Sequence, residues 1–312
     1  MKIEYSIVIP VFNEEESLEE LFANLREAFK TLNTTYEVIF VDDGSTDKSL
    51  QILKNLEKKN KDVRIFSFRR NLGKPYALMQ GFKKANGTFT VTLDADLQDD
   101  PANIPIMREK LDEGNLDLVT GWRKNRKDTP FKRITSKAFN KVVSLMFGVD
   151  VHDLNSGLRL YRTDAASQLN LYGGMHRFIP IIMHEMGYKI GEQATAHHQR
   201  KYGVSKYKSS KVISEIPDLF TVYFLTKYTM RPLHFFGKIG SFVLFAGVLI
   251  LVYLSALHFM GERIGDRPLL LLGILLVIAG IQTIFTGLLA DLLVNMNSKK
   301  EDSFPLKYGS GE

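Results

Sequence analysis

The chain of 312 residues carries a formal net charge of +6 and has no cysteine, which excludes a disulfide framework and a thiolate-ligated zinc site. Its length suffices for a sizeable core and for more than one structural unit. A basic balance suits an anionic partner, whether a nucleic acid, a phosphorylated small molecule or a membrane surface.

Predicted strands and helices alternate from residue 1 to about 210. Strands are expected at 5–12, 36–43, 63–69, 89–95 and 117–123, and helices at 14–32, 47–59, 74–85 and 103–113. The first apolar run falls directly into three glutamates, so we expect a buried strand there rather than a secretory signal. This alternation indicates an α/β fold with a mostly parallel sheet covered on both faces.

Acidic residues follow two of the predicted strands. Asp42 and Asp43 end the second strand, and Asp94 and Asp96 end the fourth. Because ligands of such sheets bind beyond the carboxyl ends of the strands, we expect all four carboxylates to converge where a nucleotide would lie. Like charges this close repel one another, so the cluster requires a cation among them.

The triplet Asp94-Ala95-Asp96 is a D-x-D motif at a strand end. One carboxylate can reach a hard divalent cation while the other faces a sugar-nucleotide, and Mg²⁺ prefers one or two carboxylates plus diphosphate oxygens. Gln98 could add a neutral oxygen. Asp100, which precedes a proline, is expected instead to cap the next helix, and a D-x-D triplet alone is common.

Two turns contain glycine after a predicted strand. In "VDDGSTD" Asp43 would accept hydrogen bonds from a base or a ribose, Gly44 permits the tight turn, and Asp47 caps the following helix. The stretch "NLGKPYALMQGF" supplies a second glycine turn that leads into a helix N-terminus. Glycine loops alone prove little.

The C-terminal third contains two uncharged runs, 239–260 and 268–290. Each run exceeds the roughly 20 residues that a helix needs to cross a bilayer, so we expect a transmembrane hairpin rather than two buried core helices. Cations flank the outer ends of both runs, at Lys227, Arg231, Lys238, Lys299, Lys300 and Lys307. The positive-inside bias therefore predicts an integral membrane protein with its N-terminal domain and both termini on the cytoplasmic side.

Residues 209–236 mix apolar and cationic side chains with breaks at Pro217 and Pro232. We expect amphipathic helices in the membrane interface, although ordinary linker helices are the alternative. The expected domains are a catalytic domain at 1–208, these interface helices at 209–236, the transmembrane hairpin at 237–294 and a cytosolic tail at 295–312.

Four motifs, "PVFNEEESL", "VDDGSTD", "NLGKPYALMQGF" and "DADLQDDP", resemble glycosyltransferase family 2 in their order and spacing. That family consists of inverting enzymes with the Rossmann-like GT-A fold. Downstream, "GWRKNRKD", "KRITSKAFN", "DLNSGLRLYR", "HRFIP" and "HHQRKYGVSKY" resemble its polyprenyl-phosphate branch, which includes dolichyl-phosphate mannose synthases and bacterial undecaprenyl-phosphate sugar transferases. The resemblance covers roughly residues 3 to 210, and the two-helix tail extends it to about 295.

On the donor side, the resemblance implies that Asp43 contacts the nucleotide and that Asp94 lies beside the ribose or the metal. Asp96 and Gln98 would hold Mg²⁺ or Mn²⁺ on the diphosphate. Further nucleotide-sugar contacts are implied for Pro10, Asn13, Glu14, Lys74 and Ala95. Arg200 and Lys206 would close over the diphosphate and the acceptor phosphate.

On the acceptor side, the resemblance implies catalytic roles for Arg123, in the segment that meets the acceptor, and for Asp153, at the position usually proposed as the base. An arginine often found four residues before Ser136 is Lys132 here, with Arg133 beside it, and either could meet the acceptor phosphate. A phosphate monoester with a second pKa of roughly 6 is already mostly deprotonated at neutral pH. We therefore expect Asp153 mainly to orient the acceptor phosphate or its cationic partners.

Two other residue types invite a functional interpretation. His197 and His198 are adjacent on an extended segment and point to opposite faces, so they are expected to be positional rather than to chelate one metal ion. Trp122, the only tryptophan, is expected to pack or to face the acceptor rather than to form a sugar platform.

The resemblance, with the two apolar runs, implies a membrane-anchored glycosyltransferase that moves one sugar from a UDP- or GDP-linked donor to undecaprenyl or dolichyl phosphate, in cell-envelope glycan synthesis. The lipid bilayer is an expected partner and nucleic acid is not, while a homo-oligomer stays open. A processive polysaccharide synthase is the first alternative, but the expected Q-x-x-R-W segment is absent. A magnesium-dependent phosphatase would need Thr or Val where Gln98 stands, and a non-catalytic adaptor would not need the acidic and basic sets.

Overall fold

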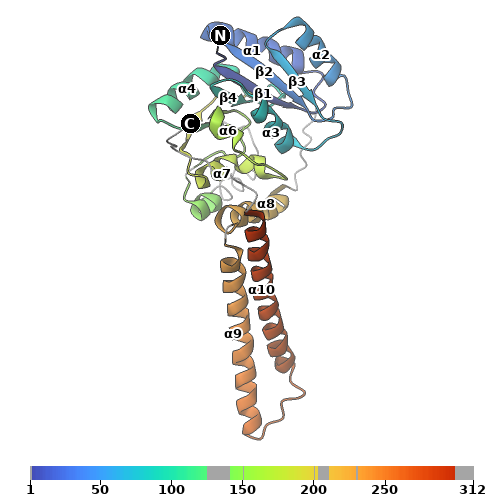
Figure 1. The fold of residues 1–312 in the computed structure, drawn as a ribbon, viewed down its shortest axis with the longest axis vertical. Helices are drawn as coiled ribbons and strands as arrows, with labels where there is room; N and C mark the ends of the chain where they lie inside the picture. The colour runs from blue at the N-terminus through green and yellow to red at the C-terminus, as the bar shows by residue number, and fades with distance from the viewer. Residues whose placement is uncertain are drawn as a thin grey trace. The chain divides into compact units, whose positions relative to one another are not determined.

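The computed structural model describes residues 2–124, 141–149, 151–199, 201–202, 211–229 and 231–298. The chain divides into two compact units, Met1–Val222 and Tyr223–Glu312. The first unit contains a mixed α/β sheet, and the second consists mainly of two long helices (Figure 1).

A seven-stranded sheet forms the centre of the first unit, in the order β3-β2-β1-β4-β6-β5-β7. Its strands are β1 (Tyr5–Val11), β2 (Tyr36–Asp42), β3 (Val63–Ser67), β4 (Phe89–Thr92), β5 (Leu118–Trp122), β6 (Arg159–Arg162) and β7 (Ile190–Ala194). Neighbouring strands pair in parallel except β6, which is antiparallel to both β4 and β5. The expected mostly parallel sheet is therefore confirmed.

Helices cover both faces of this sheet. Successive strand residues point to opposite faces, so an apolar strand needs apolar partners on both sides. The longer helices are α1 (Leu18–Leu32), α2 (Ser49–Lys59), α3 (Lys74–Lys84) and α4 (Ile104–Glu113). Ile7 and Ile9 of β1 belong to the main apolar core with residues of α1, α2 and α4. Val8, between them, contacts Gly81 of α3 on the other face, where a β-carbon at Gly81 would lie 2.1 Å from the valine. The near-continuous apolar strand "SIVIPV" is typical of a strand buried on both faces.

Shorter helices follow the antiparallel strand. They are α6 (Thr163–Ser167), the 3₁₀ helix η2 (Met175–Phe178) and α7 (Ile179–Glu185), and another 3₁₀ helix, η1 (Pro101–Asn103), precedes α4. Strands β6 and β7 were not predicted, since each is only four or five residues long and lacks a full apolar alternation.

The first helix begins at Leu18, not at residue 14 as predicted. The intervening loop binds the β2–α2 loop instead: Asn13 N donates to Ser45 Oγ (2.9 Å) and Glu14 N to Ser49 Oγ (2.9 Å). These contacts between two loops compete with helical hydrogen bonding and move the helix start by one turn.

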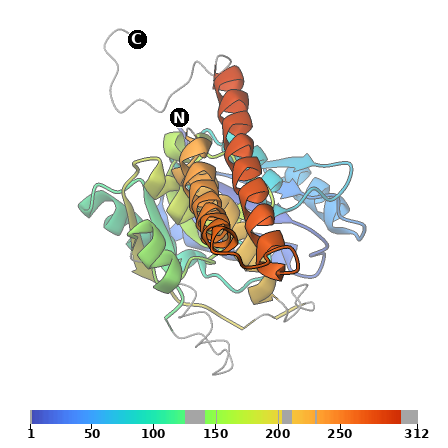
Figure 2. The ribbon, with the colours of Figure 1, turned by 90° about the horizontal axis from the view of Figure 1, so that it is seen from below.

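The second unit contains α9 (Pro232–Phe259) and α10 (Pro268–Ser298), and α8 (Lys211–Lys227) crosses the boundary between the units. By length and composition, Pro232–Phe259 and Pro268–Val294 could each cross a membrane, with a mean hydropathy of 2.4. The two helices run side by side (Figures 1 and 2) and meet at glycines. A β-carbon at Gly240 would lie 2.8 Å from the carbonyl oxygen of Gly280, and one at Gly247 would lie 2.9 Å from that of Gly273.

Candidate active site

A cavity of about 300 Å³ opens at the carboxyl ends of β1, β2 and β4, where ligands of such sheets bind. Its lining residues are Pro10, Val11, Phe12, Glu14, Asp43, Asn71, Gly73, Lys74, Asp94, Ala95 and Asp96. Carboxylates from separate strands therefore reach one cavity, as their positions in the sequence predicted.

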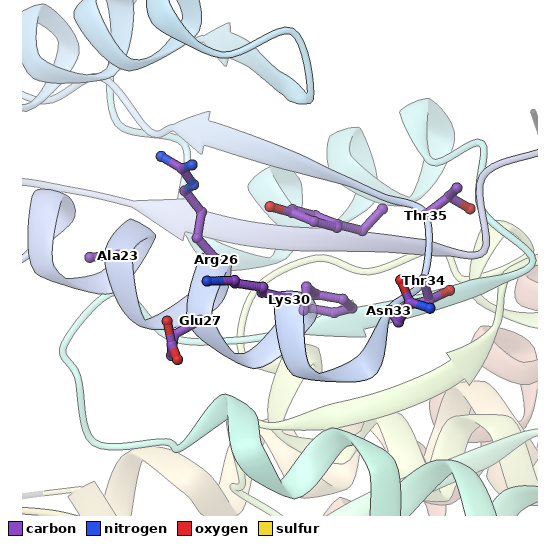
Figure 3. A pocket seen from close by; sticks show the side chains of 9 residues that line it. Ala23, Arg26, Glu27, Lys30, Asn33, Thr34 and Thr35 are labelled. Atoms are coloured by element: carbon purple, nitrogen blue, oxygen red, sulfur yellow. The ribbon is translucent and has the colours of Figure 1, made fainter.

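A larger hollow of about 700 Å³ lies at the amino-terminal end of β2, between the end of α1 and the start of that strand (Figure 3). Its polar lining includes Arg26, Lys30 and a single carboxylate, Glu27. Burial and the neighbouring Asp62 raise the pKa of its Tyr36 to about 12. This hollow lacks paired acids, so we place the candidate active site in the smaller cavity.

The cation required among the acids is supplied first by Lys74, the first residue of α3. Its Nζ lies 2.5 Å from Oδ1 of Asp94. Burial alone would raise the pKa of Asp94, but the charge and the hydrogen bond of Lys74 outweigh it and lower that pKa. Asp94 is therefore ionised at neutral pH and already paired with a cation.

Asp43 is buried and accepts hydrogen bonds from the loop that precedes α3. Its Oδ1 accepts from Leu72 N at 2.7 Å, and its Oδ2 from Gly73 N at 2.9 Å. Burial raises the pKa of Asp43 more than these backbone bonds lower it, and the charge of Asp42 raises it further. The carboxylate thus fixes the turn that carries Lys74 into the cavity.

Two glycines permit this close approach of loops. Gly73 has φ 103°, which favours glycine, and it immediately precedes α3. Gly44 has φ 70°, and a β-carbon there would lie 2.4 Å from the carbonyl carbon of Arg70. The β2–α2 loop therefore packs backbone against backbone on the loop before α3.

The prediction that all four acids converge is wrong for Asp42. Its side chain is turned into the fold, where Oδ1 accepts from Ser45 N (3.1 Å) and Oδ2 from Ser67 Oγ (2.7 Å). Neighbouring residues on a strand point to opposite sides, so Asp42 and Asp43 cannot both face the cavity.

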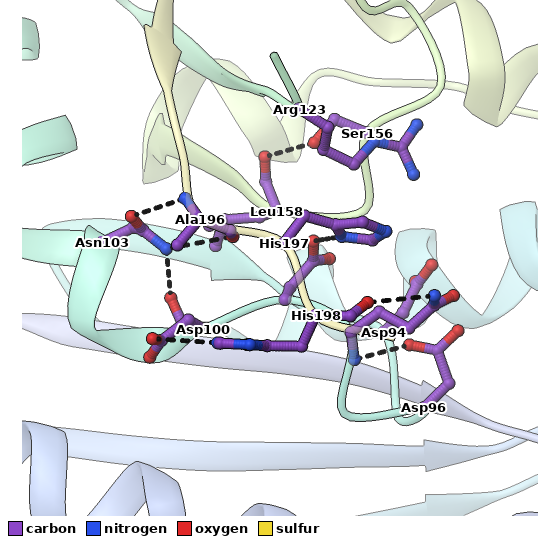
Figure 4. Close-up of polar contacts among 12 residues, drawn as sticks. Asp94, Asp96, Asp100, Asn103, Arg123, Ser156, Leu158, Ala196, His197 and His198 are labelled. Carbon is purple, nitrogen blue, oxygen red and sulfur yellow. Dashed lines mark hydrogen bonds and ion pairs between the residues drawn. The ribbon is translucent and has the colours of Figure 1, made fainter. Parts of the chain in front are cut away.

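Asp96 lies in a tight turn after β4 (Figure 4). Its Oδ1 accepts from Gln98 N at 3.2 Å, and the residue between them, Leu97, has φ 60°. Gln98 binds the extended segment after β7: its carbonyl accepts from His198 N (2.8 Å), and its Nε2 donates to the carbonyl of His198 (3.4 Å). Asp96 faces the cavity, whereas Gln98 does not belong to the lining.

The two adjacent histidines meet different acids, as their opposite faces predicted (Figure 4). His197 Nδ1 lies 3.5 Å from Oδ1 of Asp99, and His198 Nε2 lies 3.4 Å from Oδ2 of Asp100. Asp100 also accepts from Ala102 N (2.9 Å) and caps η1, which confirms its predicted capping role.

Gly157 contacts two of the acids through its backbone. A β-carbon there would lie 2.7 Å from Cγ and Oδ2 of Asp94 and 2.8 Å from Oδ2 of Asp99. Only a residue without a side chain leaves both carboxylates in place. Gly157 is the last residue of the motif "DLNSG", but its contacts with the two acids are not predicted by that motif.

Arg123 and Asp153 form a buried pair of hydrogen bonds. Arg123 Nε donates to Oδ2 at 2.6 Å and Nη2 to Oδ1 at 2.8 Å, while Nη2 also donates to the carbonyl of Asn155 (2.9 Å). Burial alone would lower the pKa of Arg123, but the hydrogen bonds and charge of Asp153 raise it. Both oxygens of Asp153 are thus engaged with a cation, an arrangement that orients rather than accepts a proton.

The other predicted site residues divide into three groups. Pro10, Glu14 and Ala95 line the cavity, as expected for donor contacts. Asn13 lies beside it, and its Oδ1 accepts from Thr46 N at 2.8 Å. Lys132, Arg133, Arg200 and Lys206 lie outside the described residues.

Sequence reasoning missed two buried polar residues near these acids. Arg159 of β6 is 4% exposed and donates to the carbonyls of Leu154 (2.8 Å) and His176 (3.0 Å). Burial and the charges of Lys74, Arg177 and Arg159 lower the pKa of His176 to about 3, so its ring is neutral. An arginine within the apolar run "LRLY" was the available signal.

A protein-family model described as "Glycosyl transferase family 2" matches residues 6–169, which is more than half of the chain. The chain belongs to glycosyltransferase family 2. It is 40% identical to the dodecaprenyl-phosphate galacturonate synthase of Rhizobium johnstonii, over 93% of this chain and 88% of that protein. It is 36% identical to the undecaprenyl-phosphate 4-deoxy-4-formamido-L-arabinose transferase of Proteus mirabilis, over 92% of this chain and 87% of that one.

Solved structures agree on the fold of this family 2 glycosyltransferase. The glucosyl-3-phosphoglycerate synthase of Mycobacterium tuberculosis has a TM-score of 0.53 and 18% identity, covering 72% of this chain and 80% of that one. A second structure of that enzyme, in complex with Mn²⁺, UDP-glucose and phosphoglyceric acid, has the same TM-score of 0.53 at 17% identity. The expected GT-A fold, family and glycosyltransferase class are thereby confirmed.

Proposed function

We propose that this glycosyltransferase moves a single sugar from a nucleotide-diphosphate donor to a polyprenyl phosphate and inverts the anomeric centre. The observation that carries the donor half is the cavity in which Asp43, Asp94 and Asp96 meet Lys74 at the ends of three strands. The acceptor half is supported by the two relatives, a dodecaprenyl-phosphate galacturonate synthase and an undecaprenyl-phosphate 4-deoxy-4-formamido-L-arabinose transferase.

Lys74 and the acids are suited to a nucleotide diphosphate. Asp43 and Glu14 present oxygens that can accept hydrogen bonds from a base or a ribose, and Lys74 provides a cation beside Asp94. The donor is UDP- or GDP-linked in this proposal. Pro10, Asn13 and Ala95 would shape the pocket wall, and Arg200 and Lys206 would close over the phosphates.

Mg²⁺ or Mn²⁺ fits the donor chemistry of the cavity. Asp94 and Asp96 offer hard carboxylate oxygens on one turn, and Gln98 follows them. Across the described part of the chain, no group of three His, Cys, Asp or Glu side chains could hold an ion by itself. Oxygens of the donor diphosphate would supply the remaining ligands, because Mg²⁺ is usually bound by one or two carboxylates plus substrate phosphates. When bound, the ion would neutralise charge on the leaving diphosphate.

The acceptor phosphate needs cations, because it adds about −1.5 to −2 charge beside an anionic donor. Asp153 and the carbonyl of Asn155 accept from Nε and Nη2 of Arg123 and hold the guanidinium in one orientation, so Nη1 is the nitrogen proposed to donate to the acceptor phosphate. Lys132 and Arg133 are proposed as further cations at the acceptor. The phosphate oxygen attacks the anomeric carbon, the bond from that carbon to the diphosphate breaks, and the nucleoside diphosphate leaves with the bond electrons. In this scheme Asp153 positions the cation and takes no proton.

The two apolar helices support a membrane anchor. We propose that 237–294 forms a transmembrane hairpin, that 209–236 lies in the interface, and that the catalytic domain at 1–208 and the tail at 295–312 are cytoplasmic. In a bacterium this is the inner membrane, where a polyprenyl phosphate acceptor resides. Anchoring confines the search for that acceptor to two dimensions, and a homo-oligomer remains compatible with it.

Purified protein would be assayed with undecaprenyl phosphate and a panel of radiolabelled nucleotide sugars. The expected product is a chloroform-soluble lipid that mild acid cleaves. Asp96→Ala and excess chelator should each abolish its formation, whereas Glu27→Gln, in the hollow at the amino-terminal end of β2, should not. Transfer that persists in Asp96→Ala, or no lipid product with any donor, would contradict the proposal.

A further inference from the structure

A carboxylate on the edge strand β7 contacts the turn that carries Asp153. Glu192 lies in register with Thr120 of β5, and its side chain is only 10% exposed. Its Oε1 accepts from the backbone N–H groups of His152 (2.8 Å) and Asp153 (3.0 Å). Its Oε2 lies 2.9 Å from His152 N and 2.8 Å from His152 Nδ1. One carboxylate thus holds two consecutive N–H groups and a ring nitrogen.

These contacts are stronger than ordinary turn hydrogen bonds. Bonds to an ionised carboxylate are roughly twice as strong as neutral ones, and Glu192 is largely screened from water. Strand β7 is the last in the sheet order, and the main apolar core, among the described residues, includes none of its side chains. Glu192 therefore acts on the turn from outside the core.

The turn held by Glu192 places Asp153 directly against Arg123. The backbone N–H of Asp153 is bonded to Glu192, while both oxygens of its side chain accept from Arg123 at 2.6 and 2.8 Å. Rotation of the turn would move the carboxylate and break the two-point contact, since such geometry tolerates little displacement. Glu192 on β7 therefore holds the backbone of the turn, the turn positions Asp153, and Asp153 orients the guanidinium of Arg123.

We infer that Glu192 is a positioning residue for transfer: it fixes the Asp153–Arg123 pair in the orientation that receives the acceptor phosphate, without itself touching donor or acceptor. This inference rests on the proposed function, because that function assigns Arg123 to the acceptor. It adds a residue that lies in neither the acidic cavity nor the acceptor-binding segment.

The fluorescence of Trp122 can report on the position of the same turn. The ring of His152 stacks on Trp122 with centroids 4.4 Å apart and planes 22° from parallel. Trp122 is the only tryptophan of the chain, so intrinsic tryptophan fluorescence reports on the surroundings of this one ring, which include His152 and, 5.6 Å from a ring centroid, Lys124 Nζ. If Glu192 fixes the turn, removing its carboxylate changes the environment of Trp122 even without substrate.

The test compares Glu192→Ala and Glu192→Gln with the full-length wild type, in detergent or proteoliposomes. Glu192→Ala should lower kcat/KM for undecaprenyl phosphate about 10- to 100-fold and leave the KM of the nucleotide sugar within about 2-fold. Glu192→Gln keeps one acceptor oxygen, so its loss should be smaller. Gln193→Ala, the neighbouring residue on the same strand, is the matched control and should behave as wild type.

A double-mutant cycle distinguishes a positioning role of Glu192 from a general contribution of this residue to stability. In an Asp153→Ala background, Glu192→Ala should cause little further loss, because the group that it positions is gone. An equal loss in both backgrounds, or a parallel rise in the KM of the nucleotide sugar, would overturn the inference. So would an unchanged Trp122 emission spectrum in Glu192→Ala.

These outcomes are distinct from failure of the proposed function. If wild-type protein makes no sugar-linked lipid from any donor, the function itself fails, whatever the variants do. If wild-type protein is active and the two substitutions are additive, only the positioning role of Glu192 fails. The fluorescence measurement needs no turnover and tests the support of the turn in either case.

Discussion

Gly157→Ala tests how tightly the acids of the cavity are packed. The added methyl group would lie 2.7 Å from Cγ of Asp94, whereas carbon atoms in contact are about 3.5 to 4.0 Å apart. Asp94 would have to shift by roughly 1 Å, which disturbs its 2.5 Å contact with Lys74. Asp99, with Oδ2 2.8 Å from the same methyl position, would also have to move.

A displacement of about 1 Å at a reacting centre can cost about 100-fold in rate, so kcat should fall about 10- to 100-fold in this variant. Overpacking should also cost about 1 to 3 kcal/mol of folding free energy. Sugar transfer to undecaprenyl phosphate and thermal unfolding measure the two effects separately. Gly265→Ala is the control, since open space surrounds that glycine and its φ is ordinary. Wild-type kcat in Gly157→Ala would refute the reasoning.

Three further predictions follow from the described contacts. The pKa of Asp94 lies below its ordinary 3.8, so the ion pair with Lys74 stabilises the fold above that pH and this stabilisation is lost on acidification. Lys74→Met should therefore unfold at a higher pH in an acid titration followed by circular dichroism. An unchanged midpoint would count against the pairing. Arg159→Met leaves one buried and one part-buried carbonyl oxygen without their donor and should cost about 2 to 4 kcal/mol, seen as a lower Tm. An unaltered Tm would be inconsistent with that role. Gly280→Leu places a β-carbon 2.8 Å from the carbonyl oxygen of Gly240 and should reduce disulfide cross-linking between cysteines introduced on α9 and α10. The chain has no native cysteine, so any cross-link comes from the introduced pair. Undiminished cross-linking would argue against the contact.

Local sequence patterns predicted much of the fold. The apolar strands followed by acids indicated a parallel sheet, and the D-x-D triplet and Asp43 were correctly placed at one crevice, because strand direction fixes where carboxyl ends lie. Alternation along a strand indicates that Asp42 and Asp43 cannot both face the cavity, but which of them faces inward depends on Ser67, which belongs to another strand 25 residues away.

The parts that sequence could not predict depend on long-range contacts. Strand β6 enters the sheet antiparallel between β4 and β5, and its four residues carry no distinctive periodicity. Gly157 is constrained by Asp94 and Asp99, about 60 residues earlier in the chain. Glu192 meets the 152–153 turn across 40 residues, and nothing in "IGEQA" indicates that contact.

The glycines at which α9 and α10 meet bear on what could pass between these two helices. At Gly240 and Gly280, and again at Gly247 and Gly273, the two backbones approach so closely that a single methyl group would not fit. A pair of helices packed this closely leaves no room for a hydrophilic polymer between their backbones at these positions. The close packing therefore agrees with the proposed transfer of a single sugar better than with passage of a growing polymer between α9 and α10.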